Sequence, residues 1–304
     1  MAVISLSFSR NARIAPSFRR HSASKITAFY MFINFQELLM KRKDLIIKYP
    51  RTPHIQGSRL QPGDEDLRQR KFSEIKGRHV VLEEKIDGAN SAISFTEDGE
   101  LRLQSRGHFL TGGAREKHYD LLKQWAAVHK DRFYDVLGDR YVMYGEWMYA
   151  KHSIYYDLLP NYFMEFDILD RDTDRFLDTP SRRQLTEELA ISSCRVLASG
   201  TFSDMNEILD YLGDSKYIST DHIEHLRENA LRLGLDADRI CRETDASRTM
   251  EGIYIKVEEN GEVVDRMKYV RASFLQTVEE SKSHWLDRPI VPNRITVPLS
   301  ELFI

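Results

Sequence analysis

The chain has 304 residues, of which 41% are hydrophobic and 30% charged, and its formal net charge is −3. This length suits one large globular domain or two small ones, and the small net charge means that a nucleic-acid partner would need basic residues gathered on one face. The two cysteines, Cys194 and Cys241, form no Cys-x-x-Cys pair, which argues against a disulfide scaffold or a cysteine zinc site and favours a reducing, cytoplasmic location. No run approaches the roughly 18 apolar residues of a membrane span, so we expect no membrane association.

The first residues differ in composition from the rest of the chain. Residues 1–36 contain no Asp or Glu, are rich in serine and carry five Arg or Lys residues. This composition is typical of an organellar transit peptide, and it also fits translated sequence upstream of a true start at Met31 or Met40. We favour the second interpretation and expect residues 1–40 to be poorly ordered. Organelle targeting stays open as the alternative to a cytoplasmic location.

The early elements read mainly as strands. Residues 79–105 carry strand signals and predict an antiparallel meander, in which Asp98-Gly99 is a two-residue hairpin signal. Residues 119–133 carry apolar side chains at three- and four-residue spacing and predict a helix. Two further strands are predicted at 141–148 and 162–170.

The later part predicts a helical insertion and a closing hairpin. Residues 203–246 have the pattern of helices, and Asn260-Gly261 is a strong hairpin signal between the last two strands. The sequence therefore predicts an α+β fold built on antiparallel sheets, with one domain over residues 41–290 and a tail over 291–304.

A lysine ends the first predicted strand, in the run Glu84-Lys85-Ile86-Asp87-Gly88. Because the glycine turns the chain directly afterwards, the ammonium group can project into a cleft. Taken alone, the same pattern also fits a solvated strand end followed by a turn.

The closing hairpin carries three cations, Lys256, Arg266 and Lys268. Side chains alternate along a strand, so these three are predicted to share one face while their apolar neighbours face a core. Cations gathered on one surface repel one another, and a polyphosphate is a natural anion for them. A charged solvent face is the alternative.

Carboxylates also stand within apolar strands, at Glu146 and on both sides of Phe166. A buried carboxylate is costly unless it is paired or bound to a metal or a ligand hydroxyl. A carboxylate can accept hydrogen bonds from a ribose diol, and an aromatic ring can stack on a purine base.

These motifs, in this order, resemble the motif series of the covalent nucleotidyltransferases, which include DNA ligases, RNA ligases and mRNA capping enzymes. Lys-x-Asp-Gly-x-Asn followed by Ser105-Arg106-Gly107 is similar to the RNA ligase 2 group in particular. The resemblance covers about residues 48–290 and rests on Lys85-x-Asp87-Gly88, Tyr144-Gly145-Glu146, Phe166-Asp167, Glu251-Gly252-x-x-x-Lys256 and Arg266-x-Lys268. It implies an antiparallel-sheet nucleotidyltransferase domain of the ATP-grasp-like ligase adenylation kind.

The resemblance implies a role for each matching residue. Lys85 is the expected nucleophile, which becomes the lysyl-AMP adduct, and Asp87 and Glu251 are the expected carboxylates that organise Mg²⁺ or Mn²⁺. Lys256 and Lys268 match clamps on the α-phosphate.

The other matching residues are expected to bind the nucleotide. Glu84 reads the adenine edge, Asn90 and Arg106 contact phosphate and ribose, Glu146 binds the ribose, and Phe166 stacks on the base. Arg266 departs from the family pattern, in which a lysine is usual, and keeps the charge with a different donor geometry.

The implied activity is that of an ATP-dependent RNA ligase acting on RNA with 5′-phosphate and 3′-hydroxyl ends. Lys85 attacks ATP and releases pyrophosphate, AMP passes to the 5′-phosphate to give AppRNA, and the 3′-hydroxyl then displaces AMP. Neighbouring cations and burial are expected to depress the pKa of Lys85 and so activate it. An end-healing kinase or phosphatase is a compatible partner.

Several alternatives remain open. Only 36 residues follow Lys268, too few for an oligonucleotide-binding (OB) barrel, so we expect no C-terminal OB barrel and disfavour a DNA ligase or a capping enzyme. A ligase for DNA or hybrid nicks and a GTP-using nucleotidyltransferase are the alternative enzymes. A non-catalytic module that binds nucleotide or RNA is the alternative outside enzymes, and the intact Lys85 disfavours it.

Overall fold

The computed structural model describes residues 45–60, 63–64, 66–280 and 288–304. The chain separates into two units, Met1–Leu45 and Ile46–Ile304, and all described helices and strands belong to the second. The segment 1–40, predicted to be poorly ordered, lies outside the described residues. Within the described ranges, no helix combines the length and apolar character needed to cross a membrane.

The fold is α+β, as predicted, and its strands join in one antiparallel system with a single short parallel pairing. The strands are β1 (Val80–Lys85), β2 (Ala89–Phe95), β3 (Leu101–Ser105), β4 (Tyr141–Trp147), β5 (Phe163–Asp170), β6 (Arg175–Leu177), β7 (Ser192–Ser193), β8 (Val196–Gly200), β9 (Gly252–Glu259) and β10 (Glu262–Val270). The helices are α2 (Asp120–Val128), α3 (Lys130–Leu137), α4 (Thr179–Leu185), α5 (Met205–Leu209), α6 (His222–Arg232), α7 (Ala237–Arg242) and α8 (Ala272–Glu280), with short 3₁₀ turns η1 (Phe72–Glu74), η2 (Ala114–Tyr119) and η4 (Leu299–Phe303).

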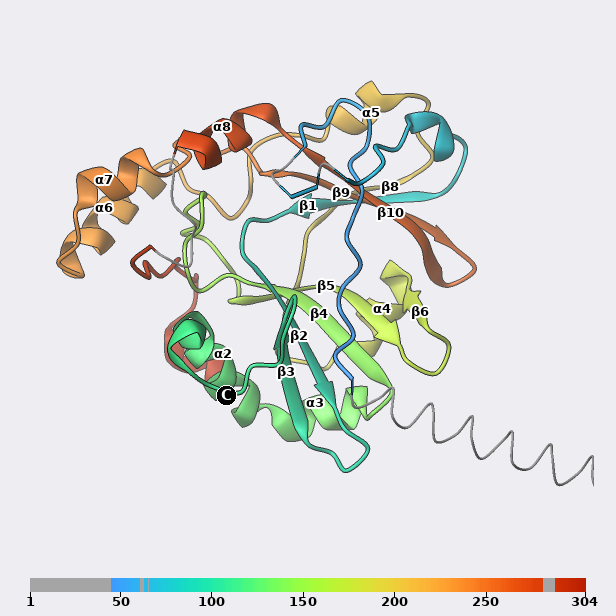
Figure 1. Ribbon diagram of the computed structural model, residues 1–304, viewed down its shortest axis with the longest axis horizontal. Helices are drawn as coiled ribbons and strands as arrows, with labels where there is room; N and C mark the ends of the chain where they lie inside the picture. Colours follow the sequence, from blue (N-terminus) through green and yellow to red (C-terminus); the bar gives the residue numbers. More distant parts are fainter. Residues whose placement is uncertain (1–44, 61–62, 65, 281–287) are drawn as a thin grey trace, which may run out of the picture. The chain divides into compact units, whose positions relative to one another are not determined.

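The strand order β3-β2-β4-β5-β6-β10-β9-β1-β8 divides into two half-sheets. We call β3-β2-β4-β5 the first half-sheet and β10-β9-β1-β8 the second. The three-residue strand β6 pairs with β5 on one side and β10 on the other and so links them. Figure 1 shows the second half-sheet above the first.

The prediction of a continuous meander over residues 79–105 is wrong at its first strand. β2 and β3 form the predicted hairpin, but β1 pairs with β8 and β9 instead of β2. The chain crosses between the half-sheets at residues 86–88. Gly88 permits this crossing, because a Cβ atom there would lie 2.5 Å from the Met148 sulfur and 2.9 Å from Cγ of Glu146. The lysine that ends β1 and the strand that follows it therefore belong to opposite halves.

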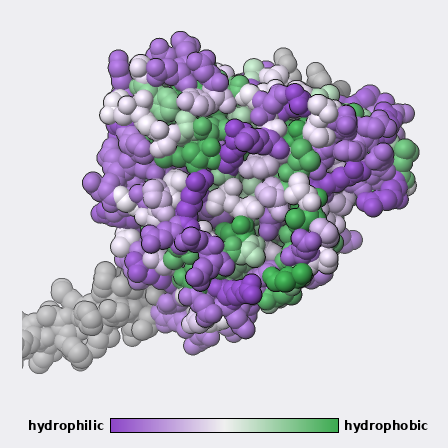
Figure 2. All heavy atoms as spheres, turned by 180° about the vertical axis from the view of Figure 1, so that it is seen from behind, coloured by the Kyte–Doolittle hydropathy of each residue, from purple (hydrophilic) through white to green (hydrophobic). Residues whose placement is uncertain are grey.

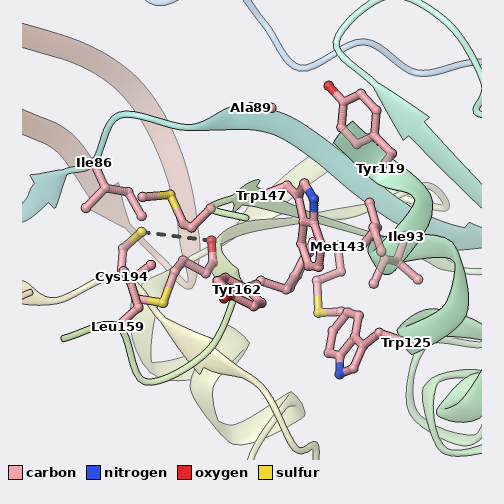
Figure 3. Close-up of a cluster of buried hydrophobic side chains, with 14 of the residues drawn as sticks. Ile86, Ala89, Ile93, Tyr119, Trp125, Met143, Trp147, Leu159, Tyr162 and Cys194 are labelled. Atoms are coloured by element: carbon pink, nitrogen blue, oxygen red, sulfur yellow. Dashed lines mark hydrogen bonds between the residues drawn. The ribbon is translucent and has the colours of Figure 1, made fainter. Parts of the chain in front are cut away.

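One core lies beneath the first half-sheet, where α2 and α3 cover it. Trp125 of α2 stacks on Phe163 of β5 with ring centroids 5.5 Å apart. The ring of Trp147 of β4 lies 6.4 Å from that of Trp125. Figure 3 shows Trp125 and Trp147 among the buried side chains, with Ile86 and Cys194 at the other end of the cluster. This core fixes β4, which carries Glu146, from behind.

A second core lies on one face of the second half-sheet. Ile253, Ile255 and Val257 of β9 are fully buried there with Leu82 and Met267. The alternation predicted from the sequence is thus confirmed, and it leaves the opposite face of β9 and β10 for the charged residues.

The segment 203–246 contains three separate short helices, α5, α6 and α7. Asp204 caps α5 by accepting from the backbone N–H groups of Asn206 and Glu207. Residues 291–304, expected as a tail, pack against the domain: Asn293 is 1% exposed and donates to the Met148 carbonyl at 2.6 Å. On the face shown in Figure 2, hydrophobic residues form several patches separated by hydrophilic ones.

Candidate active site

A cavity of about 1370 Å³ has walls from both half-sheets. Nine of the eleven predicted site residues line it, namely Glu84, Lys85, Asp87, Asn90, Arg106, Glu146, Phe166, Glu251 and Lys268. The other two, Lys256 and Arg266, lie outside its lining. A volume of this size accommodates a nucleotide.

Lys85 stands at the end of β1, directly opposite Gly252 of β9. Its ammonium nitrogen lies 2.7 Å from Oε2 of Glu251, the residue before Gly252. A Cβ atom at Gly252 would lie 1.9 Å from the backbone oxygen of Tyr269, so only glycine allows β9 and β10 to approach this closely. This close approach of β9 and β10 therefore lies directly beside the pair of Lys85 and Glu251.

The pKa of Lys85 is raised, not depressed as predicted. Burial lowers it, but the carboxylates of Glu251, Glu146 and Asp87 outweigh burial and favour the charged ammonium. The prediction was wrong because it counted the cations of the hairpin and overlooked these acids. Burial raises the pKa of Glu146 to about 7, although Lys85 and Arg106 lower it.

Asp87 is held by the loop that follows β4. Its Oδ2 accepts from the backbone N–H of Ser153 at 2.7 Å and of Ile154 at 3.1 Å, and Nδ1 of His152 lies 3.7 Å from Oδ1. The backbone N–H of Asp87 donates to the Tyr156 hydroxyl at 2.9 Å. Burial raises the pKa of Asp87, but the lowering effects of His152 and the Ser153 N–H are larger in sum. The pKa of Asp87 is therefore lowered.

The acids around Lys85 fit a divalent metal only together with a ligand. Within the described ranges, no group of three His, Cys, Asp or Glu residues could hold a metal ion by itself. Burial and the neighbouring Asp87 raise the pKa of Glu251, although Lys85 and Lys268 lower it. Mg²⁺ commonly binds one or two carboxylates together with substrate phosphates, and Asp87 and Glu251 match that arrangement.

Lys256 is fully buried in an ionic network beneath the cavity. Its ammonium lies 2.8 Å from Oε2 of Glu83 and 3.0 Å from Oδ1 of Asp167, and it donates to the Phe166 carbonyl. Arg182 of α4 pairs with Glu83 and lies 2.6 Å from Glu165. The network thus joins β9, β1, β5 and α4.

Arg266 belongs to the same network. It lies opposite Lys256 across β9 and β10, its guanidinium is 3.7 Å from Asp167, and it stacks over the Phe176 ring at 4.0 Å. The predicted common face of Lys256, Arg266 and Lys268 is confirmed, but the need for an external anion is wrong for the first two. The protein supplies those anions from β1 and β5, which the hairpin pattern alone does not reveal.

Lys268 lines the cavity, whereas the other two cations of the hairpin, Lys256 and Arg266, do not. Its ammonium lies 2.5 Å from Asp64, and its backbone pairs with Pro53 and Ile55 through bonds of 2.9 Å. The sequence did not indicate that Pro53, Ile55 and Asp64 contact Lys268, because the prolines and glycines around them leave no helix or strand periodicity. Burial and Lys85 lower the pKa of Lys268 despite the neighbouring Asp64.

A β-bulge directs Phe166 into the cavity. Tyr144 pairs with Asp167 and Gly145 with Glu165, which leaves Phe166 as the extra residue of β5. Bulges commonly re-aim a side chain at a functional site. Tyr49 and Tyr254 pack against Phe166 and line the same cavity.

The remaining predicted residues line the same cavity as Phe166 and Lys85. Asn90 of β2 pairs directly with Glu146 of β4, and Arg106 follows the end of β3. Glu84 is buried, with the Arg195 guanidinium 4.0 Å away, and burial raises its pKa to about 7.

The antiparallel fold, with a strand-end lysine in a cavity between two half-sheets, defines a nucleotidyltransferase domain. A model of the RNA ligase family matches residues 78–270, and the chain belongs to this family. No curated protein matches the chain.

Solved structures of the Naegleria gruberi RNA ligase are similar to the chain. The ligase with PPi gives a TM-score of 0.45 and 18% identity, covering 77% of this chain and 58% of that one. A mutant of that ligase with ATP and Mn gives 0.47 and 15%, covering 77% and 59%, and another with AMP and Mn gives 0.46 and 15%, covering 76% and 57%. The chain therefore spans little more than half the length of the solved chains it matches.

Proposed function

We propose that this protein is an ATP-dependent RNA ligase that joins 5′-phosphate and 3′-hydroxyl RNA ends through a lysyl-AMP intermediate. One observation carries the proposal: in a domain of the RNA ligase family, the Lys85 ammonium lies in a nucleotide-sized cavity, 2.7 Å from Glu251. The cavity also brings together the acids, the arginine and the aromatic ring that the family resemblance implied.

The residues support three successive displacements. The Lys85 nitrogen, once it has lost a proton, attacks the α-phosphorus of ATP, and its bond to phosphorus forms as pyrophosphate leaves. The oxygen of an RNA 5′-phosphate then displaces the lysine and yields AppRNA. Finally the RNA 3′-hydroxyl attacks that 5′-phosphate, and AMP leaves as the strand is sealed.

The surrounding side chains prepare these steps. Glu251 Oε2 accepts the hydrogen bond from Lys85 and so orients the nitrogen. Lys268 and Arg106 lie where they can neutralise phosphate charge, and preorganised charge of this kind lowers transition-state energy. Mg²⁺ or Mn²⁺, which Asp87 and Glu251 would hold with the phosphates, would supply further neutralisation of phosphate charge.

Labelling tests the proposal directly. Purified protein is incubated with Mg²⁺ and α-labelled ATP or GTP beside a Lys85→Ala variant, and intact mass reveals protein that was purified already adenylylated. Label from ATP on the wild type but not the variant is the expected result. Label from GTP alone would redirect the function to guanylyl transfer, and no adduct by either method would leave a nucleotide-binding module.

The substrate and location are proposals too. We expect joining of RNA strands with 5′-phosphate and 3′-hydroxyl ends, so other ends would first need a kinase or phosphatase. Sealing of DNA or hybrid nicks in preference to RNA would contradict this. Both cysteines are free thiols, which supports a cytoplasmic location. Imaging of a tagged chain, full-length and starting at Met40, distinguishes it from organelle targeting.

A further inference from the structure

Tyr49 precedes the family-matched region, yet it is built into the cavity wall. It is 5% exposed, and its hydroxyl donates to Oδ2 of Asp167 at 2.5 Å. Its ring meets the Phe166 ring edge-on, with centroids 5.0 Å apart and planes at 81°. Tyr49 therefore contacts both Phe166, whose ring lines the cavity, and the buried Asp167, which follows Phe166 in the sequence.

Tyr254 also packs against Phe166. The two rings are 6.4 Å apart, with their planes inclined by only 30°, and both line the cavity. The Tyr254 hydroxyl donates to the Tyr49 hydroxyl at 3.3 Å and shares a hydrogen bond with the Thr52 hydroxyl. A line of hydroxyl groups thus runs from Thr52 through Tyr254 and Tyr49 to Asp167.

This line ends on a fixed group. Asp167 is fully buried and lies 3.0 Å from the Lys256 ammonium, so its position is set by the ionic network. The hydroxyl line consequently ties the Tyr254 ring to β5, the strand that carries Phe166. The Tyr254 ring, whose centroid lies 6.4 Å from that of Phe166, is thereby held at the cavity wall.

We propose that Tyr49 and Thr52 are positioning residues that hold Phe166 and Tyr254 in place at the cavity wall where the nucleotide base binds. The proposal rests on the proposed function for the identity of the nucleotide. It extends the site to Tyr49 and Thr52, which precede β1 and act through Tyr254 and Asp167. Loss of a hydroxyl should therefore weaken ligands that contain a base and leave pyrophosphate binding unchanged.

Calorimetry with AMP and with pyrophosphate, beside adenylylation kinetics, tests this proposal on Tyr49→Phe, Thr52→Val and the double variant. We expect each single change to raise the Kd for AMP and the KM for ATP by about three- to tenfold, with kcat within about twofold and pyrophosphate affinity unchanged. Because both hydroxyl groups act through Tyr254, the double variant should lose less than the product of the single effects. Tyr162→Phe is the matched control, since its buried hydroxyl donates to the Asn293 carbonyl at 2.7 Å outside the cavity lining.

The outcomes separate the two proposals. Equal weakening of AMP and pyrophosphate, or an unchanged AMP Kd in both single variants, overturns the positioning role while wild-type labelling leaves the ligase proposal intact. AMP binding that weakens in the variants, with no adduct on the wild type, supports the positioning role and refutes the ligase. A wild-type chain that binds neither AMP nor ATP overturns both.

Discussion

Lys256 of β9 and Asp167 of β5 lie 3.0 Å apart and form a buried ion pair between the two half-sheets. Both side chains are fully buried, and Glu83 and Arg182 extend the pair into a network with nearly balanced charge. The pair lies directly behind Phe166, whose carbonyl also accepts from Lys256. It therefore connects the rigidity of the domain to the position of Phe166 in the cavity wall.

Replacing Lys256 by Met should destabilise the domain strongly. Removal of one partner leaves Glu83 and Asp167 buried without their cation, and breaking a buried pair in this way costs about 3–5 kcal/mol. Urea unfolding followed by circular dichroism measures this loss. Arg227→Ala, which breaks the exposed pair with Asp238, is the matched control and should change stability little. A Lys256→Met protein as stable as the wild type would show that the network contributes no stability.

Gly252→Ala should abolish adenylylation and lower stability. The added methyl group would lie 1.9 Å from the Tyr269 backbone oxygen, so β9 and β10 must part beside Glu251 and Lys85. Labelling with ATP and a thermal unfolding curve measure the two effects. Gly213→Ala, where no atom lies within 4 Å of the new Cβ, is the control. Normal labelling by Gly252→Ala would show that adenylylation does not depend on the close approach of β9 and β10.

Stability should fall as the pH rises through the titration of Glu84. Its folded pKa of about 7 exceeds the ordinary glutamate value of 4.5, so between these values the folded state binds more protons than the unfolded state. The contribution of this carboxyl is then favourable at low pH and is lost as the pH rises towards 7 and above. Relative to Glu84→Gln, the wild type should lose about 2–3 kcal/mol of unfolding free energy between pH 5 and pH 8.

Urea unfolding at several pH values measures that difference. The exposed Glu188→Gln variant is the control for a carboxyl-to-amide change and should track the wild type. A wild-type minus Glu84→Gln difference that stays constant from pH 5 to pH 8 would contradict the buried, raised-pKa assignment.

Metal binding should depend on the nucleotide. Because no three metal-ligand residues cluster within the described ranges, Mn²⁺ alone should bind weakly, and ATP phosphates should complete its coordination. The Lys85→Ala protein is titrated calorimetrically with Mn²⁺, without ATP and with saturating ATP. The protein–ATP complex should bind Mn²⁺ at least about tenfold more tightly than either the protein alone or ATP alone does. Tight binding of Mn²⁺ to the nucleotide-free protein would overturn this view of Asp87 and Glu251.

The sequence by itself determined the features that depend on neighbouring residues. Asn260 and Gly261 adopt positive φ angles of 55° and 85°, as the hairpin between β9 and β10 requires. The alternation around Lys256 set which side chains face the core, because successive residues of any strand point to opposite faces. The family motifs likewise located Lys85 and eight other residues that line the cavity.

Only the tertiary structure decided which groups these residues meet. Lys85 faces Glu251 across 166 positions of sequence, and Tyr49 reaches Asp167 across 118. Such pairings depend on the order of the strands, which local periodicity does not encode, so the sequence indicated cations and acids but not which of them pair. That is why the sign of the Lys85 pKa shift, the partners of Lys256 and the place of Tyr49 emerged only when the two half-sheets were brought together.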